Sequence, residues 1–220
     1  MSNARNNILM RLRGSRSKIP PAARITQEET TPTWSVEARI ELFKTRLEAV
    51  RAEVHVTTTN EWTGKLHALS RDKGLKQLLY APGGPHGAEI ERGWPADNEG
   101  PRLITRDQPV ATWKEELFFE IGGAVTSVRA GIAETGTLVL WPDAAEPRSL
   151  SLVPPVHFAI LRVESLYSTF QELIETEQWR QGLPTNALLV SGPSKSADIE
   201  QTLAYGIHGP VELIVILVVD

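Results

Sequence analysis

The sequence predicts an α/β domain in which helices cover both faces of a largely parallel sheet. Strand-like and helix-like segments alternate along the chain, which is typical of parallel sheets. The last apolar segment, residues 211–219, is almost continuously apolar and rich in β-branched residues, as expected of a strand that is buried on both faces. A length of 220 residues with 41% hydrophobic residues suits one domain with a substantial core.

Helical patterns dominate the first half of the chain. Residues 34–54 place apolar side chains at spacings of three and four, which predicts an amphipathic helix with Ser35 as its cap. Further along, we expect a helix at 60–71, a short strand at 76–80, a long loop at 82–109 and a two-turn helix at 113–119.

Strand patterns dominate the second half, where β-branched residues are frequent. We expect strands at 124–133, 137–141, 149–153, 156–163 and 187–190, a helix at 165–176, a tight turn at 191–195, a short helix at 197–203 and the final strand at 211–219.

The first 27 residues form a distinct basic segment. They hold six of the 23 Lys and Arg residues and no acid, so residues 28–220 carry 17 bases against 27 acids, a net charge of −10. We therefore divide the chain into a basic segment, 1–27, and one domain, 28–220. Ile8, Leu9 and Leu12 favour a short amphipathic helix in the segment, while disorder and a transit peptide stay open. The acidic domain argues against nucleic-acid binding.

The chain contains no cysteine. This excludes disulfides, thiolate nucleophiles and iron–sulfur clusters held by this chain's own thiolates. No two histidines have metal-ligand spacing, so no metal site is predicted. The most apolar stretch, 211–219, is far shorter than the ~20 residues of a membrane span. We expect a cytoplasmic protein, and any redox centre must be a bound cofactor or belong to another chain.

The segment from Leu188 to Glu200 predicts a strand, a tight turn and the start of a helix. Free backbone N–H groups at such a turn can bind a small anion. Alternatively, Ser196 only caps the helix and Asp198 satisfies its dipole, without any ligand. The candidate ligand-binding residues of this turn are Ser191, Gly192, Ser194, Lys195, Ser196 and Asp198.

Glu134 lies in a second turn, Ala-Glu-Thr-Gly-Thr, and is the candidate catalytic carboxylate. It could act as a base, a nucleophile or a hydrogen-bond acceptor, with Thr135, Gly136 and Thr137 contacting the ligand. Alternatively, Gly136 supplies a positive φ to a hairpin and Glu134 is solvated. His208, in Gly-Ile-His-Gly-Pro, is a further ligand-binding candidate, although a lone turn histidine more often caps backbone groups.

Three segments resemble, in the correct order, the signatures of the LUD-domain family. They are GIAETGTLVL (131–140), LVPPVHFAIL (152–161) and SGPSKSADIEQTLAYGIHGPVELIVILV (191–218). The resemblance covers roughly residues 34–220. It is strongest to the C-type lactate-utilisation branch, because the chain starts with a similar RNNILMRLR segment and lacks the cysteine-rich segments of the B-type branch. Lys195-Ser196 stands where Arg-Thr is common, and residues 84–100 match nothing in the family pattern.

The resemblance implies a three-layer α/β/α fold similar to the NagB/RpiA/CoA-transferase-like group. In open sheets, ligands collect at the carboxyl ends of strands, so both turns are expected to face one such cleft. The resemblance also implies a subunit that helps to oxidise L-lactate to pyruvate, with A-type and B-type lactate-utilisation proteins as partners and iron–sulfur clusters on the partner.

Two other functions stay open from the sequence. One is a stand-alone enzyme of the CoA-transferase and formyltetrahydrofolate cyclo-ligase fold group, acting on a phosphorylated or acyl substrate. The other is a non-catalytic scaffold whose basic N-terminal segment docks on an acidic partner.

Overall fold

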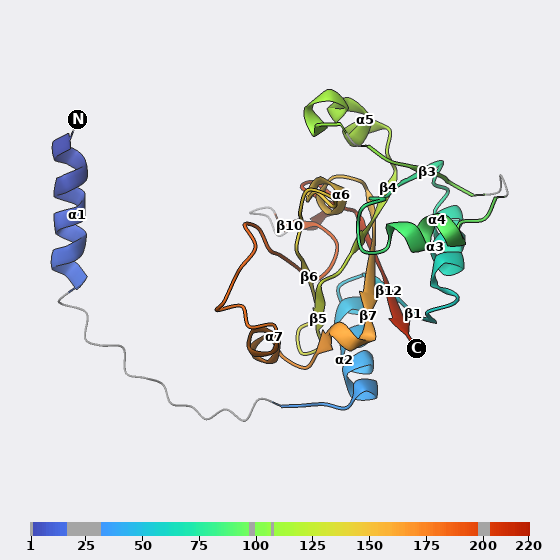
Figure 1. Cartoon of the computed structure of the whole chain (residues 1–220), viewed down its shortest axis with the longest axis horizontal. Helices are drawn as coiled ribbons and strands as arrows, with labels where there is room; N and C mark the ends of the chain where they lie inside the picture. The colour runs from blue at the N-terminus through green and yellow to red at the C-terminus, as the bar shows by residue number, and fades with distance from the viewer. Residues whose placement is uncertain (1, 17–31, 97–99, 107, 198–202) are drawn as a thin grey trace. The chain divides into compact units, whose positions relative to one another are not determined.

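A six-stranded sheet with every pair of neighbours parallel forms the centre of the fold (Figure 1). The computed structural model describes residues 2–16, 32–96, 100–106, 108–197 and 203–220. In spatial order the strands are β1 (Glu53–Thr58), β12 (Glu212–Val219), β7 (Val156–Arg162), β4 (Gly123–Ser127), β2 (Gln77–Leu79) and β3 (Arg102–Ile104). The predicted α/β class with a largely parallel sheet is confirmed.

The side chains of β12 alternate between two hydrophobic cores, one on each face of the sheet. Leu213, Val215 and Leu217 pack in one core with α2 (Val36–Glu48). Ile214, Ile216 and Val218 pack in the other core, with residues of α3 (Trp62–Asp72) and α4 (Gly87–Gly93). Figure 1 shows α3 and α4 together on one side of the sheet. The doubly buried final strand is thus as predicted.

A smaller sheet helps α2 to cover its face of the central sheet. Its strands, in spatial order, are β8 (Leu166–Tyr167), β5 (Ala130–Ile132), β6 (Thr137–Leu140) and β9 (Leu188–Val190). Leu138 and Leu140 turn inward to the core that contains α2. Val139 turns outward and packs with Leu173 of α7 (Phe170–Thr176).

The remaining elements are short, apart from the N-terminal helix. They are α1 (Ser2–Arg16), η1 (Val110–Thr112), α5 (Lys114–Phe119), α6 (Ser149–Leu152), η2 (Val163–Ser165) and the antiparallel pair β10 (Lys195–Ala197) and β11 (Leu203–Tyr205). Residues 31–220 form one compact unit, and α1 belongs to a separate N-terminal unit. None of the described helices combines the length and apolar character needed to cross a membrane.

Two predicted elements have the wrong type. Residues 149–152 form helix α6, whereas we expected a strand over 149–153. Pro154 and Pro155 follow it, and prolines cannot donate the hydrogen bonds of a sheet. The helix expected at 197–203 is wrong at both ends, because Ala197 pairs with Leu203 in the β10–β11 pair, and residues 198–202 lie outside the described residues.

Four predicted boundaries are wrong. The strand expected at 124–133 is two strands, β4 and β5, which belong to different sheets. The first helix of the domain ends at Glu48 instead of residue 54, and Val54 belongs to strand β1. The presumed loop 82–109 contains helix α4 and strand β3. Only the second half of the helix expected at 165–176 is helical, because its first residues form η2 and β8.

Candidate functional site

The structure brings the two predicted turns side by side. Strands β6 and β9 pair antiparallel, so the start of β6 lies beside the end of β9. The turn before β6 and the turn after β9 are therefore neighbours. Thr137 Oγ1 and Ser191 Oγ form a hydrogen bond of 2.7 Å, and Thr135 Oγ1 lies 2.6 Å from Thr137 Oγ1. Three hydroxyl groups from the two turns therefore form one chain of hydrogen bonds.

A cavity of about 240 Å³ lies beneath the turn that follows β9. Four of the predicted ligand-binding residues line it, namely Ser191, Gly192, Ser194 and His208. Ser151 and His157 also line it, from α6 and β7. This volume is below the usual range of drug-sized ligand sites, so the cavity suits a small molecule.

The cavity lies at the amino ends of β7 and β12, where His157 and Leu213 are the second residues of their strands. We expected the turns to face the carboxyl edge of the parallel sheet. The difference arises because β9 belongs to the smaller sheet, so its carboxyl end is not an end of the parallel sheet.

His157 is fully buried in strand β7. Its Nε2 lies 2.8 Å from Thr126 Oγ1, within hydrogen-bonding distance. Burial lowers the pKa of His157 to about 4, since the charged imidazolium loses its hydration there. The ring is therefore neutral at pH 7 and can act only as a hydrogen-bonding group.

The other lining groups leave hydrogen-bonding capacity for a ligand. The backbone of Ser194 is engaged, because its N–H donates to Pro210 O (2.8 Å) and its carbonyl accepts from Gly206 N (3.0 Å). Within the described part of the chain, the Ser194 hydroxyl has no hydrogen bond. No carboxylate is found among the described lining residues. The cavity can therefore accept a small polar or anionic ligand through neutral donors.

Glu134 and Thr135 do not line this cavity, and both are exposed. The Glu134 backbone N–H donates to Ser168 O (3.0 Å), which fixes the turn but leaves the carboxylate in solvent. Gly136 is buried against α2, where an added Cβ would lie 2.6 Å from Arg46 Cβ.

Lys195 and Ser196, which we predicted at the start of a helix, lie in strand β10 instead. Lys195 is exposed and Ser196 pairs with Ala204, so neither has the position assumed for a helix N-terminus. Asp198 lies outside the described residues.

Sequence reasoning missed Ser151 as a residue of the cavity. Ser151 was placed in a strand, whereas α6 directs it to the cavity, where its hydroxyl also donates to Arg148 O (3.1 Å). The one feature of the sequence that could have indicated Ser151 is its position directly before the signature segment 152–161. Among the described residues, no group of three or more His, Asp or Glu side chains could hold a metal ion.

Comparisons with known proteins place the chain in a family. The family model described as LUD domain matches residues 40–218. An uncharacterized protein of Neisseria meningitidis serogroup B is 38% identical over 98% of this chain and 94% of its own length. A protein of an Exiguobacterium species named lactate utilization protein C is 37% identical, over 91% of this chain and 88% of its own length.

A solved structure supports the same fold. The crystal structure of a DUF162 family protein from Deinococcus radiodurans has a TM-score of 0.60 and 22% identity, covering 84% of this chain and 99% of the other. The family model spans both predicted turns, the cavity that lies beneath one of them and the central sheet. The chain therefore belongs to the LUD-domain family.

Proposed function

We propose that this chain is a non-redox subunit of a system that oxidises L-lactate to pyruvate. The proposal rests on the relative named lactate utilization protein C, which is 37% identical over 91% of this chain. Oxidation of L-lactate to pyruvate releases two electrons and two protons. Because this chain has no cysteine, we assign the electron acceptor to iron–sulfur clusters on a partner protein of the B type.

The cavity beneath Ser191–Ser194 is the proposed binding site for a small carboxylate. Its size excludes bulky substrates, and neutral hydroxyl and imidazole groups can hydrogen-bond a carboxylate without a fixed positive charge. The absence of a carboxylate among the described lining residues avoids repulsion of an anionic ligand. In this role the chain binds and positions the hydroxy acid while the partner accepts the electrons.

Reconstitution tests the proposal. We expect the purified chain alone to show no L-lactate-dependent reduction of an artificial electron acceptor such as dichlorophenolindophenol. Addition of the A-type and B-type proteins should produce that reduction, and removal of this chain from the mixture should abolish it. Lactate oxidation by this chain alone, or full activity without it, would refute the assignment.

The catalytic role of Glu134 is tested in the same mixture. Because its carboxylate is exposed, Glu134→Gln should leave the melting temperature unchanged, so that any loss of turnover reports on function. A catalytic Glu134 requires a fall of at least about a hundredfold, the lower end of what an acid–base group contributes. The matched control is Glu120→Gln, another exposed glutamate that lines no described cavity. Equal activity of the two variants would leave Glu134 without a catalytic role.

A further inference from the structure

His157 is the buried imidazole of the small cavity, and its two ring nitrogens differ in their hydrogen bonds. Nε2 lies 2.8 Å from Thr126 Oγ1, where strand β7 pairs with strand β4. Nδ1 has no hydrogen bond within the described part of the chain. Because His157 is only 1% exposed and lines the cavity, Nδ1 is the ring nitrogen that is left for a ligand.

The proton of the Thr126 hydroxyl determines the direction of this hydrogen bond. Thr126 is buried, and His157 is the one hydrogen-bond partner of its Oγ1 among the described residues. A buried donor without an acceptor costs about 1–3 kcal/mol, so the hydroxyl proton should go to Nε2. Nε2 is then the unprotonated nitrogen. Since His157 is neutral at pH 7, its single ring proton lies on Nδ1.

The opposite direction would leave a donor where it has little room for a partner. If Nε2 donated to Oγ1, the unpartnered donor would be the Thr126 hydroxyl. The hollow that Thr126 lines has a volume of about 10 Å³, the lower limit for one water molecule. If Oγ1 donates, the unpartnered donor is the N–H of His157, and the cavity that His157 lines has about 240 Å³. The second arrangement gives the remaining donor room for a ligand.

The other groups of the small cavity suit a ligand that accepts hydrogen bonds. The Ser194 hydroxyl is a second donor without a hydrogen bond among the described residues, and it lines the same cavity. An ionised carboxylate has only acceptor oxygens, so it pairs with such donors. No carboxylate among the described lining residues competes for them.

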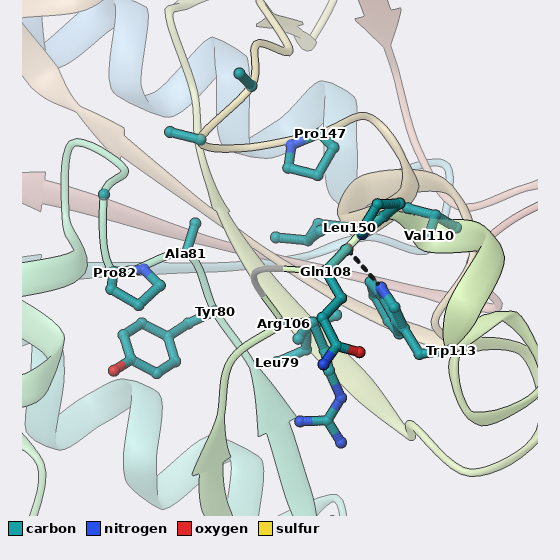
Figure 2. A pocket seen from close by; sticks show the side chains of 14 residues that line it. Leu79, Tyr80, Ala81, Pro82, Arg106, Gln108, Val110, Trp113, Pro147 and Leu150 are labelled. Carbon is teal, nitrogen blue, oxygen red and sulfur yellow. Dashed lines mark hydrogen bonds between the residues drawn. The ribbon is translucent and has the colours of Figure 1, made fainter.

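The larger cavity that shares α6 uses its main donors within the protein. It has a volume of about 530 Å³ and lies at the carboxyl ends of β2 and β3. Figure 2 shows the Trp113 indole N–H bonded to the Gln108 carbonyl, at 3.0 Å. Arg106, the one charged residue among the described lining residues, donates to the carboxylate of Glu116. Of these two cavities, the small one is better suited to a carboxylate.

We propose that Thr126 is a positioning residue of the small cavity, whose hydroxyl holds His157 in the tautomer that offers Nδ1–H to a bound carboxylate. The inference rests on the proposed function for the identity of that carboxylate, L-lactate. Thr126 is not among the lining residues of the cavity, so it acts through His157. Its effect is to exclude the tautomer with an unprotonated Nδ1, whose lone pair would repel a carboxylate oxygen.

Nitrogen NMR of the isotope-labelled full chain tests the direction of the hydrogen bond without any ligand. Protonated and unprotonated ring nitrogens of histidine resonate in separate regions of the spectrum. At pH 7 His157 should show a protonated Nδ1 and an unprotonated Nε2. The spectrum of the His157→Gln variant identifies its signals among those of the five histidines. A proton on Nε2 in the unmodified chain would overturn the proposal.

Two substitutions separate the hydroxyl group of Thr126 from the shape of its side chain. Thr126→Val keeps the shape but removes the donor, so the ring proton of His157 should distribute over both nitrogens. Thr126→Ser retains the donor and should show the tautomer of the unmodified chain. A valine variant with an unchanged tautomer would contradict the role of Thr126. If circular dichroism shows that the valine variant does not fold, the spectrum of the unmodified chain still decides.

Titration with acetate, glycolate, L-lactate and pyruvate tests the class of ligand. At least one of them should bind with a Kd below about 10 mM and shift the Nδ1 signal of His157. Thr126→Val should weaken that binding at least about threefold, the loss of one neutral hydrogen bond, whereas Thr126→Ser should bind within about twofold of the unmodified chain.

The outcomes of the titration distinguish this inference from the lactate role. Absence of binding by all four carboxylates, or equal binding by the valine variant, would overturn the inference. Binding of another carboxylate but not of L-lactate, weakened by Thr126→Val, would support the role of Thr126 and refute the cavity as the lactate site.

Discussion

Gly136 holds a conformation and a contact that other residues do not tolerate. Its φ is +62°, and an added Cβ would lie 2.6 Å from Arg46 Cβ and 3.1 Å from Leu47 N. Gly136→Ala should therefore lower the free energy of unfolding by about 1–3 kcal/mol, through backbone strain and displacement of α2. Urea denaturation followed by circular dichroism measures the change.

Gly64 supplies the control for this substitution. It lies inside α3, where an added Cβ would meet no atom within 4 Å. Gly64→Ala should raise the free energy of unfolding by about 0.5–1 kcal/mol, because alanine favours the helix. If both variants shift the free energy of unfolding in the same direction, the close packing of Gly136 on α2 does not explain the need for glycine at this position.

His157 makes stability depend on pH. Burial lowers its folded-state pKa to about 4, whereas the unfolded chain has a value near 6.5, so the unfolded state takes up the proton first as pH falls. The stabilising contribution is complete above about pH 6.5 and is lost progressively toward pH 4. At pH 5 the loss should be about 2 kcal/mol relative to pH 7.

The His157→Gln variant isolates this effect. Glutamine retains a polar partner for Thr126 Oγ1 but does not titrate, so its unfolding free energy should fall less between pH 7 and pH 5. The measurement is urea denaturation of both proteins at the two pH values. A parallel decline in both proteins would assign the acid sensitivity to other groups.

At the scale of elements, strand β12 carries much of the stability. Ile216 is fully buried and lies between β1 and β7 in the centre of the sheet. Ile216→Ala should lower the free energy of unfolding by about 2–5 kcal/mol, the usual cost of such a cavity.

Val56 of the neighbouring strand β1 provides the matched control. It is also aliphatic and in a parallel strand, but its side chain is 45% exposed. Val56→Ala should lower the free energy of unfolding by less than about 1 kcal/mol in the same denaturation experiment. Similar losses at the two positions would argue against a core centred on β12.

The sequence patterns differ in how many secondary structures each one allows. The nine-residue apolar run at 211–219 has one reasonable interpretation, and β12 confirms it. Ser149–Leu152 has only four residues, a length that fits one helical turn as well as a strand. The apolar spacing of residues 34–54 continues past the end of the helix. Arg51 turns the chain with a φ of +70°, and Val54 of β1 then happens to fall at the next apolar position of the helical pattern.

The candidate site could be predicted only in part from the sequence. The turn residues Ser191 and Ser194 were identifiable from their motif, and they do line a cavity. The contact between Thr126 and His157 was not identifiable, because the two residues lie on separate strands, β4 and β7. Such long-range contacts arise from the strand order, in which β4 lies beside β7 although β5 and β6 intervene in the sequence.

At the scale of the whole molecule, two cavities that share helix α6 differ in the side chains that line them. Hydroxyl and imidazole groups line the small cavity at the amino ends of β7 and β12, whereas mainly apolar residues line a larger cavity of about 530 Å³ at the carboxyl ends of β2 and β3. Helix α6 contributes to both, because Leu150 lines the larger cavity and Ser151 lines the small cavity.

The basic N-terminal segment, residues 1–27, is predicted to dock on an acidic partner. It has six bases and no acid, and α1 exposes the apolar side chains of Ile8, Met10 and Leu12. Because residues 31–220 form a compact unit of their own, deletion of 1–27 should change their melting temperature by less than about 1 °C. Size-exclusion chromatography with the A-type and B-type proteins should show that the truncated chain no longer joins the complex.

A charge-reversal variant separates the two features of this segment. Replacement of Arg5, Arg13 and Lys18 by glutamate keeps the apolar side chains but removes the excess of positive charge. If attraction to an acidic surface drives docking, this variant should also fail to join the complex, and rising salt should weaken the association of the unmodified chain. A truncated chain that still joins the complex would show that docking depends on the domain formed by residues 31–220.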